Sequence, residues 1–349
     1  MKKRLLSLVA LLLAAGGGLH AQEIIVGTGF TTRFDNREYS GNTFDESKTL
    51  FSARLSPRVG VQWAEKNRLI IGVDLLQDFG DDKKFLTRAR PLLYYSFRTE
   101  NVEAYAGVFD RKALTGDYSK AFFSDSLAFY KNRMAGFLGA YRSTSRPKTY
   151  VEFGIDWEGI YGKASREKFR ILSAGRYTVC DSFYFGYAFS MFHFASSAEE
   201  HNVSDNMLFN PFAGSEFTAF FDFDVKLGML LAPQRVRRFE EGWKKPCGGQ
   251  LDFKMTRWGV KLENTLFVGE NLMPYYAVHG SELYSGERFY ATTEHVYNRT
   301  SIGYERSFFN RSVTVEACMI FHYDGTGLGN QQVVRLSVDI EKIFNKGRK

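Results

Sequence analysis

Charged side chains recur at alternate positions in several segments of this chain, and charges spaced in this way can line a pore. Alternate residues of a β-strand share one face, and charges of one sign along a pore wall bias which ions pass. The basic set is Arg33, Arg54, Arg58, Arg88, Arg90 and Arg335. The acidic set is Glu152, Asp156, Asp222, Asp224, Glu263 and Glu316. We expect these sets to face each other across a water-filled lumen; the alternative is that they only solvate or brace it.

A second group of chemically useful side chains lies in the aromatic-rich segment 269–290. Aromatic rings there could stack on a sugar or constrict a pore, and they could equally serve as ordinary packing residues in a barrel mouth. These mouth-loop aromatics are Tyr275, Tyr276, Tyr284, Phe289 and Tyr290.

Catalytic and metal-binding motifs are absent from the sequence. A hydrolase needs a base beside a nucleophile or an activated water, and the histidines within predicted strands are His193, His295 and His322. By register, His193 faces lipid and His322 faces the lumen. The chain has no G-x-S-x-G or H-E-x-x-H motif, and its three cysteines form no C-x-x-C. We expect no catalytic, metal or cofactor site, and we predict that the chain is not an enzyme.

The elements that must position these charges are long alternating strands. In the segment 51–63 apolar residues alternate with polar ones, and the same pattern recurs at 221–231 and 334–341. These alternating segments run about 10 to 14 residues, whereas strands of soluble proteins average about 5–6 residues and strands that cross a membrane need about 9–11. The 56 aromatic residues, made up of 33 Phe, 19 Tyr and 4 Trp, suit interfacial girdles. A secreted β-sandwich is the alternative, with shorter strands.

The first 21 residues have the pattern of a cleaved secretory signal. Lys2, Lys3 and Arg4 precede an apolar run at 5–15, and Ala21 ends an A-x-A-like site. Removing these residues leaves 328 of the 349, and the loss of three basic side chains lowers the net charge from +7 to +4. No Lys/Arg-rich segment suggests a nucleic-acid partner.

The alternation yields sixteen predicted strands, with fourteen as the alternative count. They are 23–34, 50–64, 68–79, 84–98, 102–110, 130–142, 148–158, 167–178, 182–194, 206–213, 218–235, 250–257, 259–269, 291–307, 312–323 and 331–344. Short turns alternate with long polar or aromatic loops along the chain. We therefore expect one all-β domain over 22–344, an up-and-down antiparallel barrel that crosses a membrane, followed by a short basic tail at 345–349.

With its signal to Ala21, its long alternating strands and a last strand that ends at Phe344, the chain resembles the porin-like outer-membrane β-barrels of Gram-negative bacteria. The resemblance implies an outer-membrane location, contact with lipid, and recognition of Phe344 by the barrel-assembly machinery. In this chain five residues follow that aromatic. Val334, Leu336, Val338 and Ile340 should then touch lipid, and Arg335, Asp339 and Glu341 should face the lumen.

The function expected from this reading is a porin-like channel for passive uptake of small polar, including anionic, solutes. One alternative is a non-transporting barrel that serves as a scaffold or as a subunit of an assembly or secretion complex. An outer-membrane hydrolase is the least favoured alternative. The sequence leaves open whether the protein forms a homo-oligomer.

Overall fold

In the computed structural model the described residues are 23–41, 47–80, 85–199, 202–237 and 242–345. The predicted signal segment 1–21 lies outside them, as does the tail beyond residue 345. The strands are β1 (Glu23–Glu38), β2 (Lys48–Trp63), β3 (Asn67–Asp78), β4 (Arg88–Arg98), β5 (Val102–Asp110), β6 (Arg133–Arg142), β7 (Tyr150–Gly159), β8 (Lys168–Cys180), β9 (Phe183–Phe194), β10 (Ser204–Thr218), β11 (Asp222–Leu231), β12 (Gln234–Val236), β13 (Cys247–Arg257), β14 (Val260–Gly269), β15 (Val296–Phe308), β16 (Val313–Tyr323) and β17 (Leu328–Asn345).

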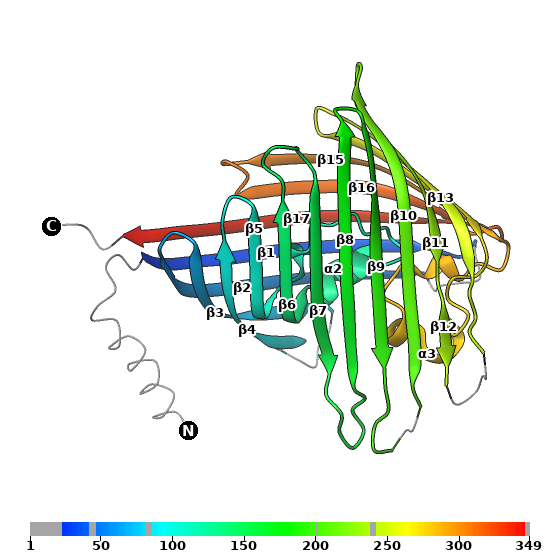
Figure 1. The fold of residues 1–349 in the computed structure, drawn as a ribbon, viewed down its shortest axis with the longest axis horizontal. Coiled ribbons are helices and arrows are strands. Elements are labelled where there is room, and N and C mark those ends of the chain that lie inside the picture. Colours follow the sequence, from blue (N-terminus) through cyan, green and yellow to red (C-terminus); the bar gives the residue numbers. More distant parts are fainter. Residues whose placement is uncertain (1–22, 42–46, 81–84, 200–201, 238–241, 346–349) are drawn as a thin grey trace.

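The strands close into one antiparallel barrel. β1 pairs with β2 on one side and with β17 on the other, so that Glu23 of β1 lies opposite Asn345 of β17. β1 and β17, the first and last strands, run side by side in Figure 1. The short β12 continues β11, because both pair with β10 and only Ala232 and Pro233 separate them. The wall therefore has sixteen strands, and the predicted sixteen-stranded up-and-down barrel is confirmed.

The two faces of the wall follow the alternation of the sequence. In β17, Val334 and Ile340 are exposed on the outer surface, whereas Arg335, Asp339 and Glu341 line a cavity inside the barrel. An outer belt of apolar side chains around a polar lumen is the arrangement that a bilayer requires of a barrel. Among the described residues, no helix is both long and apolar enough to cross a membrane.

The two ends of the barrel differ in their connections. At one end, here called the turn end, neighbouring strands are joined by a few residues, as between β2 and β3 or between β13 and β14. At the opposite loop end the connections are longer, up to the segment 270–295. In outer-membrane barrels the short turns are periplasmic and the long loops external, so we expect the turn end to face the periplasm.

Two loop-end connections fold into the lumen, where α2 and α3 lie within the barrel (Figure 1). Segment 111–132 carries η1 (Arg111–Ala113) and α2 (Asp125–Tyr130), and segment 270–295 carries α3 (Tyr276–Leu283) and η2 (Arg288–Ala291). We call these two segments together the plug. A sixteen-stranded barrel is too wide for wall side chains alone to fill, so the plug supplies much of the apolar core.

Candidate functional site

The aromatic core of the plug occupies the loop-end half of the lumen. The mouth-loop residues Tyr275, Tyr284, Phe289 and Tyr290 are buried there, and Tyr276 is partly buried against them. They pack on wall residues that include Tyr39, Phe192, Phe267 and Tyr297. The structure thus places the aromatic segment inside the barrel mouth as packing, the second of the two readings that the sequence allowed.

The two segments of the plug are joined to each other by backbone and carboxylate contacts. Ser124 N donates to Ser285 O at 2.9 Å and Glu287 N donates to Lys120 O at 2.8 Å. Asp125 N donates to the Glu287 carboxylate at 3.2 Å. Between these contacts the two segments approach so closely that a Cβ on Gly286 would overlap the carbonyl of Ala121. The two segments therefore act as one packed unit.

Asp125, at the start of α2, fastens the plug to the wall. Its carboxylate accepts from Arg299 Nη2 of β15 at 2.8 Å and pairs with Lys120 within the plug, while Arg33 Nη1 of β1 donates to its backbone carbonyl at 3.3 Å. Burial acts to raise the pKa of the Asp125 carboxyl, but Lys120 and Arg299 outweigh it and hold that pKa below its usual range. The pKa of the neighbouring Glu287 carboxyl is raised by burial and by the charge of Asp125.

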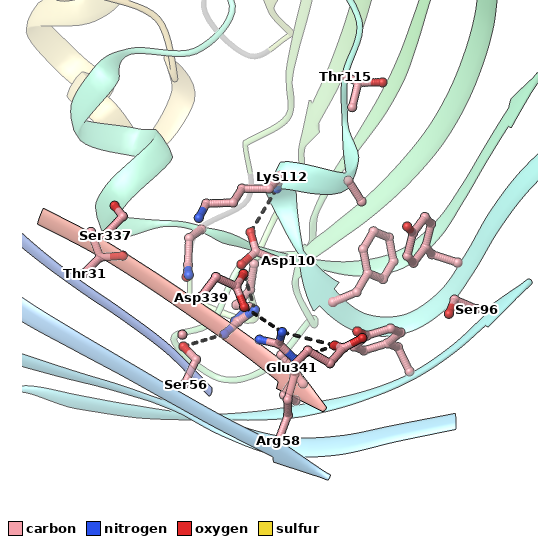
Figure 2. Close-up of a pocket in the computed structure, with 18 of the residues that line it drawn as sticks. Thr31, Ser56, Arg58, Ser96, Asp110, Lys112, Thr115, Ser337, Asp339 and Glu341 are labelled. Carbon is pink, nitrogen blue, oxygen red and sulfur yellow. Dashed lines mark hydrogen bonds and ion pairs between the residues drawn. The ribbon is translucent and has the colours of Figure 1, made fainter. Parts of the chain in front are cut away.

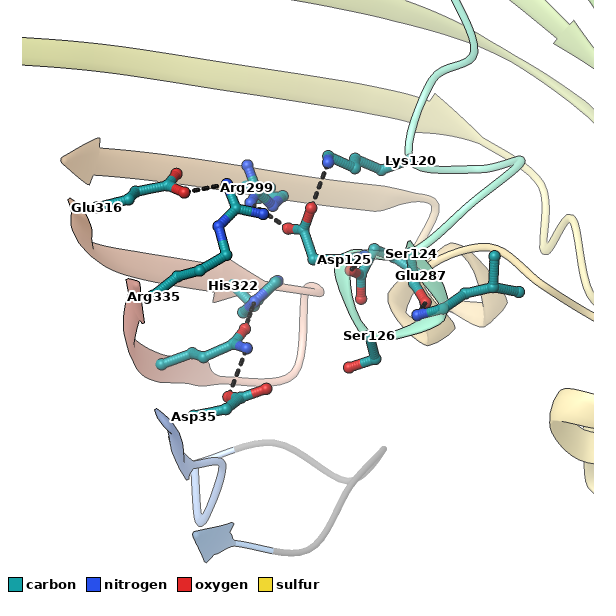
Figure 3. A network of polar contacts seen from close by, with 12 residues as sticks. Asp35, Lys120, Ser124, Asp125, Ser126, Glu287, Arg299, Glu316, His322 and Arg335 are labelled. Carbon is teal, nitrogen blue, oxygen red and sulfur yellow. Dashed lines mark hydrogen bonds and ion pairs between the residues drawn. The ribbon is translucent and has the colours of Figure 1, made fainter. Parts of the chain in front are cut away.

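Below α2 a buried polar network joins β1, β16 and β17 (Figure 3). Asp35 pairs with Arg33 at 3.1 Å and with Arg37 at 2.8 Å. Gln331 Nε2 donates to Asp35 Oδ1 at 2.7 Å, and Gln331 Oε1 lies 3.2 Å from His322 Nε2. We call Asp35, Arg37, His322 and Gln331 the loop-end network.

The tautomer of His322 follows from its partners. Because Gln331 Oε1 can only accept, His322 Nε2 carries the proton and Nδ1 accepts from the Tyr297 hydroxyl at 2.9 Å. The Phe289 ring stacks on the imidazole with a centroid distance of 4.3 Å, and Tyr39 meets it edge-on. Among the described residues, no Ser, Thr or Cys side chain bonds to His322. The imidazole is linked to a carboxylate through an amide, and Phe289 and Tyr39 cover it.

The other histidines lie apart from this network. His193 stands at the loop end of β9, stacked near Phe169 and 3.7 Å from Asp205. His295 is exposed, and its Nδ1 contacts Gly269 O at 3.1 Å. No group of three His, Cys, Asp or Glu residues in the described part of the chain could hold a metal ion.

The turn-end half of the lumen contains a cavity of about 590 Å³, here called the chamber (Figure 2). It extends from α2 and Phe129 to Glu65 and Lys66 in the turn between β2 and β3. Among the residues that the structure describes, ten basic and six acidic side chains line it. Four members of the basic set belong to its wall: Arg33, Arg54, Arg58 and Arg335.

The remaining members of the basic set lie on β4, away from the chamber lining. Arg88 donates to the backbone carbonyl of Tyr130 in the plug. Arg90 lies opposite Asp74 in the pairing of β3 with β4.

None of the six members of the acidic set lines the chamber. Glu152 accepts from the backbone N–H groups of Thr115 and Gly116, each at 3.1 Å, and Asp156 accepts from Arg111 at 2.5 Å, so both anchor segment 111–132. The other four bind locally: Asp222 to Thr218, Asp224 to Tyr184, Glu263 to Lys254 and Glu316 to Arg335.

Several residues of these sites cannot be identified from the sequence, whereas the predicted closing-strand residue Phe344 can be located in the structure. An alternating pattern identifies a face of a strand and not a contact, so the sequence does not indicate the residues that anchor the plug or form the loop-end network. They include Asp35, Arg37, Asp125, Arg299 and Gln331. Phe344 lies at the turn end of β17, opposite Ile24 of β1, and is half exposed. Its recognition by assembly machinery stays a prediction.

Comparisons with known proteins bear on both the family and the fold. A family model described as Lipid A 3'-O-deacylase-type matches residues 20–341. No curated protein matches this sequence.

Solved structures that resemble the barrel include two outer-membrane proteins of Pseudomonas aeruginosa. OpdK is 9% identical, with 91% of this chain and 99% of that chain covered at a TM-score of 0.49. OprD is 10% identical, with 94% and 98% covered at a TM-score of 0.47. OprB of Pseudomonas putida is 8% identical, with 92% and 94% covered at a TM-score of 0.49. The closed wall and its apolar outer belt are those of a porin-like outer-membrane barrel, as the sequence predicts.

Proposed function

This chain belongs to the lipid A 3'-O-deacylase-type family, and we propose that it hydrolyses an acyl ester of a lipid A-type glycolipid in the outer membrane. The observation that carries the proposal is the family match itself, which spans 20–341 and so takes in almost the whole barrel together with the plug. The sequence-based prediction of a non-enzymatic protein rested on missing motifs, and the family match leaves catalysis open.

The loop-end network offers the groups that such a reaction needs. In ester hydrolysis a water adds to the carbonyl carbon while a base takes its proton. The bond between the carbonyl carbon and the sugar oxygen then breaks, and the protonated base returns the proton to that oxygen, so that a sugar hydroxyl and a fatty acid form. A neutral His322 can accept that proton, and Asp35, reached through Gln331, stabilises the charged imidazole. Arg37 and Arg33 are donors for the developing oxyanion or for a phosphate of the glycolipid.

The proposal requires the plug to move. Phe289 stacks on His322 at 4.3 Å and α2 covers Arg33 and Arg37, so the described arrangement is a closed one. The glycolipid would approach from the loop end, which we expect to face outward. Loops that open and close over an active site gate substrate entry in many enzymes, and the plug would act in this way.

The direct test is mass spectrometry of lipid A extracted from outer membranes in which the full chain is produced. We expect the mass of one acyl chain to be lost with the wild type, and at least tenfold less conversion with His322→Gln, since loss of a general base costs about 10²–10⁴ in rate. His193→Gln, on the outer face of β9, is the matched control and should behave as the wild type. Unchanged lipid A with a correctly folded wild-type barrel would refute the proposal.

A second candidate function, a porin-like channel for small polar and anionic solutes, is favoured by the chamber. Its basic lining would attract anions that enter from the turn end, and the plug would act as its gate. Planar bilayers test this: stepwise conductance whose anion preference falls in Arg54→Glu with Arg58→Glu supports a channel. Absence of any conductance, together with stable co-purified protein partners, would favour the scaffold or complex-subunit role instead.

A further inference from the structure

Arg54 of β2 is a buried cation with unused hydrogen-bonding capacity at the inner end of the chamber. Its side chain is only 6% exposed, and its Nε and Nη1 atoms have no hydrogen-bond partner. Its contacts are weak ones: Asp74 Oδ1 at 3.7 Å, the Tyr130 carbonyl at 3.5 Å and the Phe129 ring at 5.1 Å. A buried guanidinium that is poorly paired costs free energy, which a ligand anion would offset.

The nearby acidic side chains are already engaged by other groups. Asp74 accepts from Ser56 Oγ at 2.7 Å and from Arg133 Nη2 at 3.1 Å, and Asp110 pairs with the same Arg133 at 3.3 Å. Arg88 adds a further positive charge beside Arg54 and directs its Nη2 to the carbonyl of Tyr130. The carboxylates of Asp74 and Asp110 are therefore both engaged by Arg133, and neither accepts a hydrogen bond from Arg54.

The form of the chamber indicates what kind of anion fits. Its volume of about 590 Å³ lies within the range of pockets for small organic molecules, about 300–1,000 Å³. The lining of the chamber includes the apolar or aromatic side chains of Leu92, Tyr94, Phe109 and Phe129, and the Phe129 ring lies against Arg54. From this geometry we infer a binding site, centred on Arg54, for a small phosphate-bearing solute that enters from the turn end, with its phosphate at Arg54 and its body against the aromatic wall.

The site is centred away from the proposed hydrolytic one, although Arg33 pairs with Asp35 and also borders the chamber. Arg54 and Arg133 make no contact with Asp35, His322 or Gln331 among the interactions of the described residues. Loss of phosphate binding would thus leave ester hydrolysis untouched, and an inactive hydrolase could still bind phosphate. The two proposals can fail independently.

The test is isothermal titration calorimetry on the purified full-length barrel in detergent, with inorganic phosphate and glucose 6-phosphate as probes. We expect saturable binding of both, tighter for the sugar phosphate, and at least about tenfold weaker binding in Arg54→Gln, because a hydrogen bond to a charged group contributes about 1.5–3 kcal/mol. Arg54→Lys keeps the charge and should retain part of the affinity. Arg306→Gln, at an exposed position near the turn end of β15 and outside the chamber lining, is the matched control and should bind as the wild type.

Each variant should first show the native shift in electrophoretic mobility on heating, since Asp74 keeps Arg133 and Ser56 when Arg54 is changed. The inference is overturned if phosphate gives no saturable heat with the wild type, or if folded Arg54→Gln binds as tightly. Acetate and glucose are the two remaining probes. Acetate binding equal to that of phosphate would overturn the phosphate assignment, and glucose binding equal to that of glucose 6-phosphate would overturn the role of the charge.

Discussion

The two halves of the lumen are built on opposite principles. The loop-end half is filled by a plug whose aromatic side chains are packed and whose polar groups, such as Asp125 and Asp35, are held by buried arginines. The turn-end half is a chamber whose ion pairs, such as that of Arg58 with Glu341, stay partly exposed. One wall, with one alternating pattern, thus borders both a core and an aqueous cavity.

The charges of the loop-end half therefore stabilise the fold, whereas the exposed charges of the chamber can bind a solute. In the loop-end half the carboxylates of Asp35 and Asp125 are paired with buried arginines, so removing either carboxylate leaves a buried charge without its partner. Toward the turn end of the chamber, charges such as those of Arg58 and Glu341 are partly exposed and screened by water and salt, so single changes there should alter binding or selectivity more than stability. The following changes test that distinction, from the largest expected effect to the smallest.

Gly286→Val should displace segment 111–132 of the plug and so open the loop-end half of the lumen. A side chain at this position would overlap the Ala121 carbonyl, and overpacking of this kind costs about 1–3 kcal/mol. We expect segment 111–132 to become sensitive to proteases and bilayer conductance to rise well above that of the wild type. Gly242→Val, where an added Cβ meets nothing within 4 Å, is the control. A docked plug in Gly286→Val would show that the two segments are not a single unit.

Asp125→Asn should loosen the plug without a steric clash. The change removes the ion pairs with Arg299 and Lys120 and leaves Arg299 buried without a counter-charge. After a discount for the partial exposure of Asp125, we expect a loss of about 2 kcal/mol in the free energy of plug docking, measured by amide hydrogen exchange of α2. Glu199→Gln, which breaks an exposed pair with Lys163, should change nothing. Equal exchange in all three proteins would contradict the role of Asp125.

The docking of the plug should also depend on pH through Glu287. Burial and the charge of Asp125 raise the pKa of Glu287 in the folded state, so its protonated form favours docking. That contribution is present below the ordinary glutamate pKa and is lost as pH rises through the raised one. The lowered pKa of Asp125 acts in the opposite direction, since its contribution is lost as pH falls toward that lowered value. Hydrogen exchange of α2, corrected for intrinsic rates, should accelerate with rising pH, and Glu287→Gln should flatten that dependence.

The sequence predicts the wall far better than the site. The number of strands and their two faces follow from the alternation within each strand, and the pairing of β1 with β17 follows once those strands form a closed barrel. The loop-end network does not, because Asp35 and Gln331 lie 296 positions apart and only barrel closure brings them together. Asp125 lies in a non-periodic segment that the sequence identifies only as a long loop. His322 was assigned to the lumen by register, but nothing local to it indicates that Phe289 would cover its ring.

The smallest effect should come from Glu341→Gln at the turn end, which makes the same carboxylate-to-amide change as Asp125→Asn. Glu341 pairs with Arg58 at 3.2 Å and with Arg68 at 3.0 Å, but it is partly exposed and Arg58 keeps Asp339 at 2.8 Å. Exposed pairs contribute about 0.2–1 kcal/mol, so we expect a shift in unfolding midpoint below that of Asp125→Asn, shrinking further in 0.5 M salt, where the Debye length is about 4–5 Å. If Glu341→Gln proved as costly as Asp125→Asn, the chamber would be a structural region like the plug, and its charges could not be regarded as free to bind a solute.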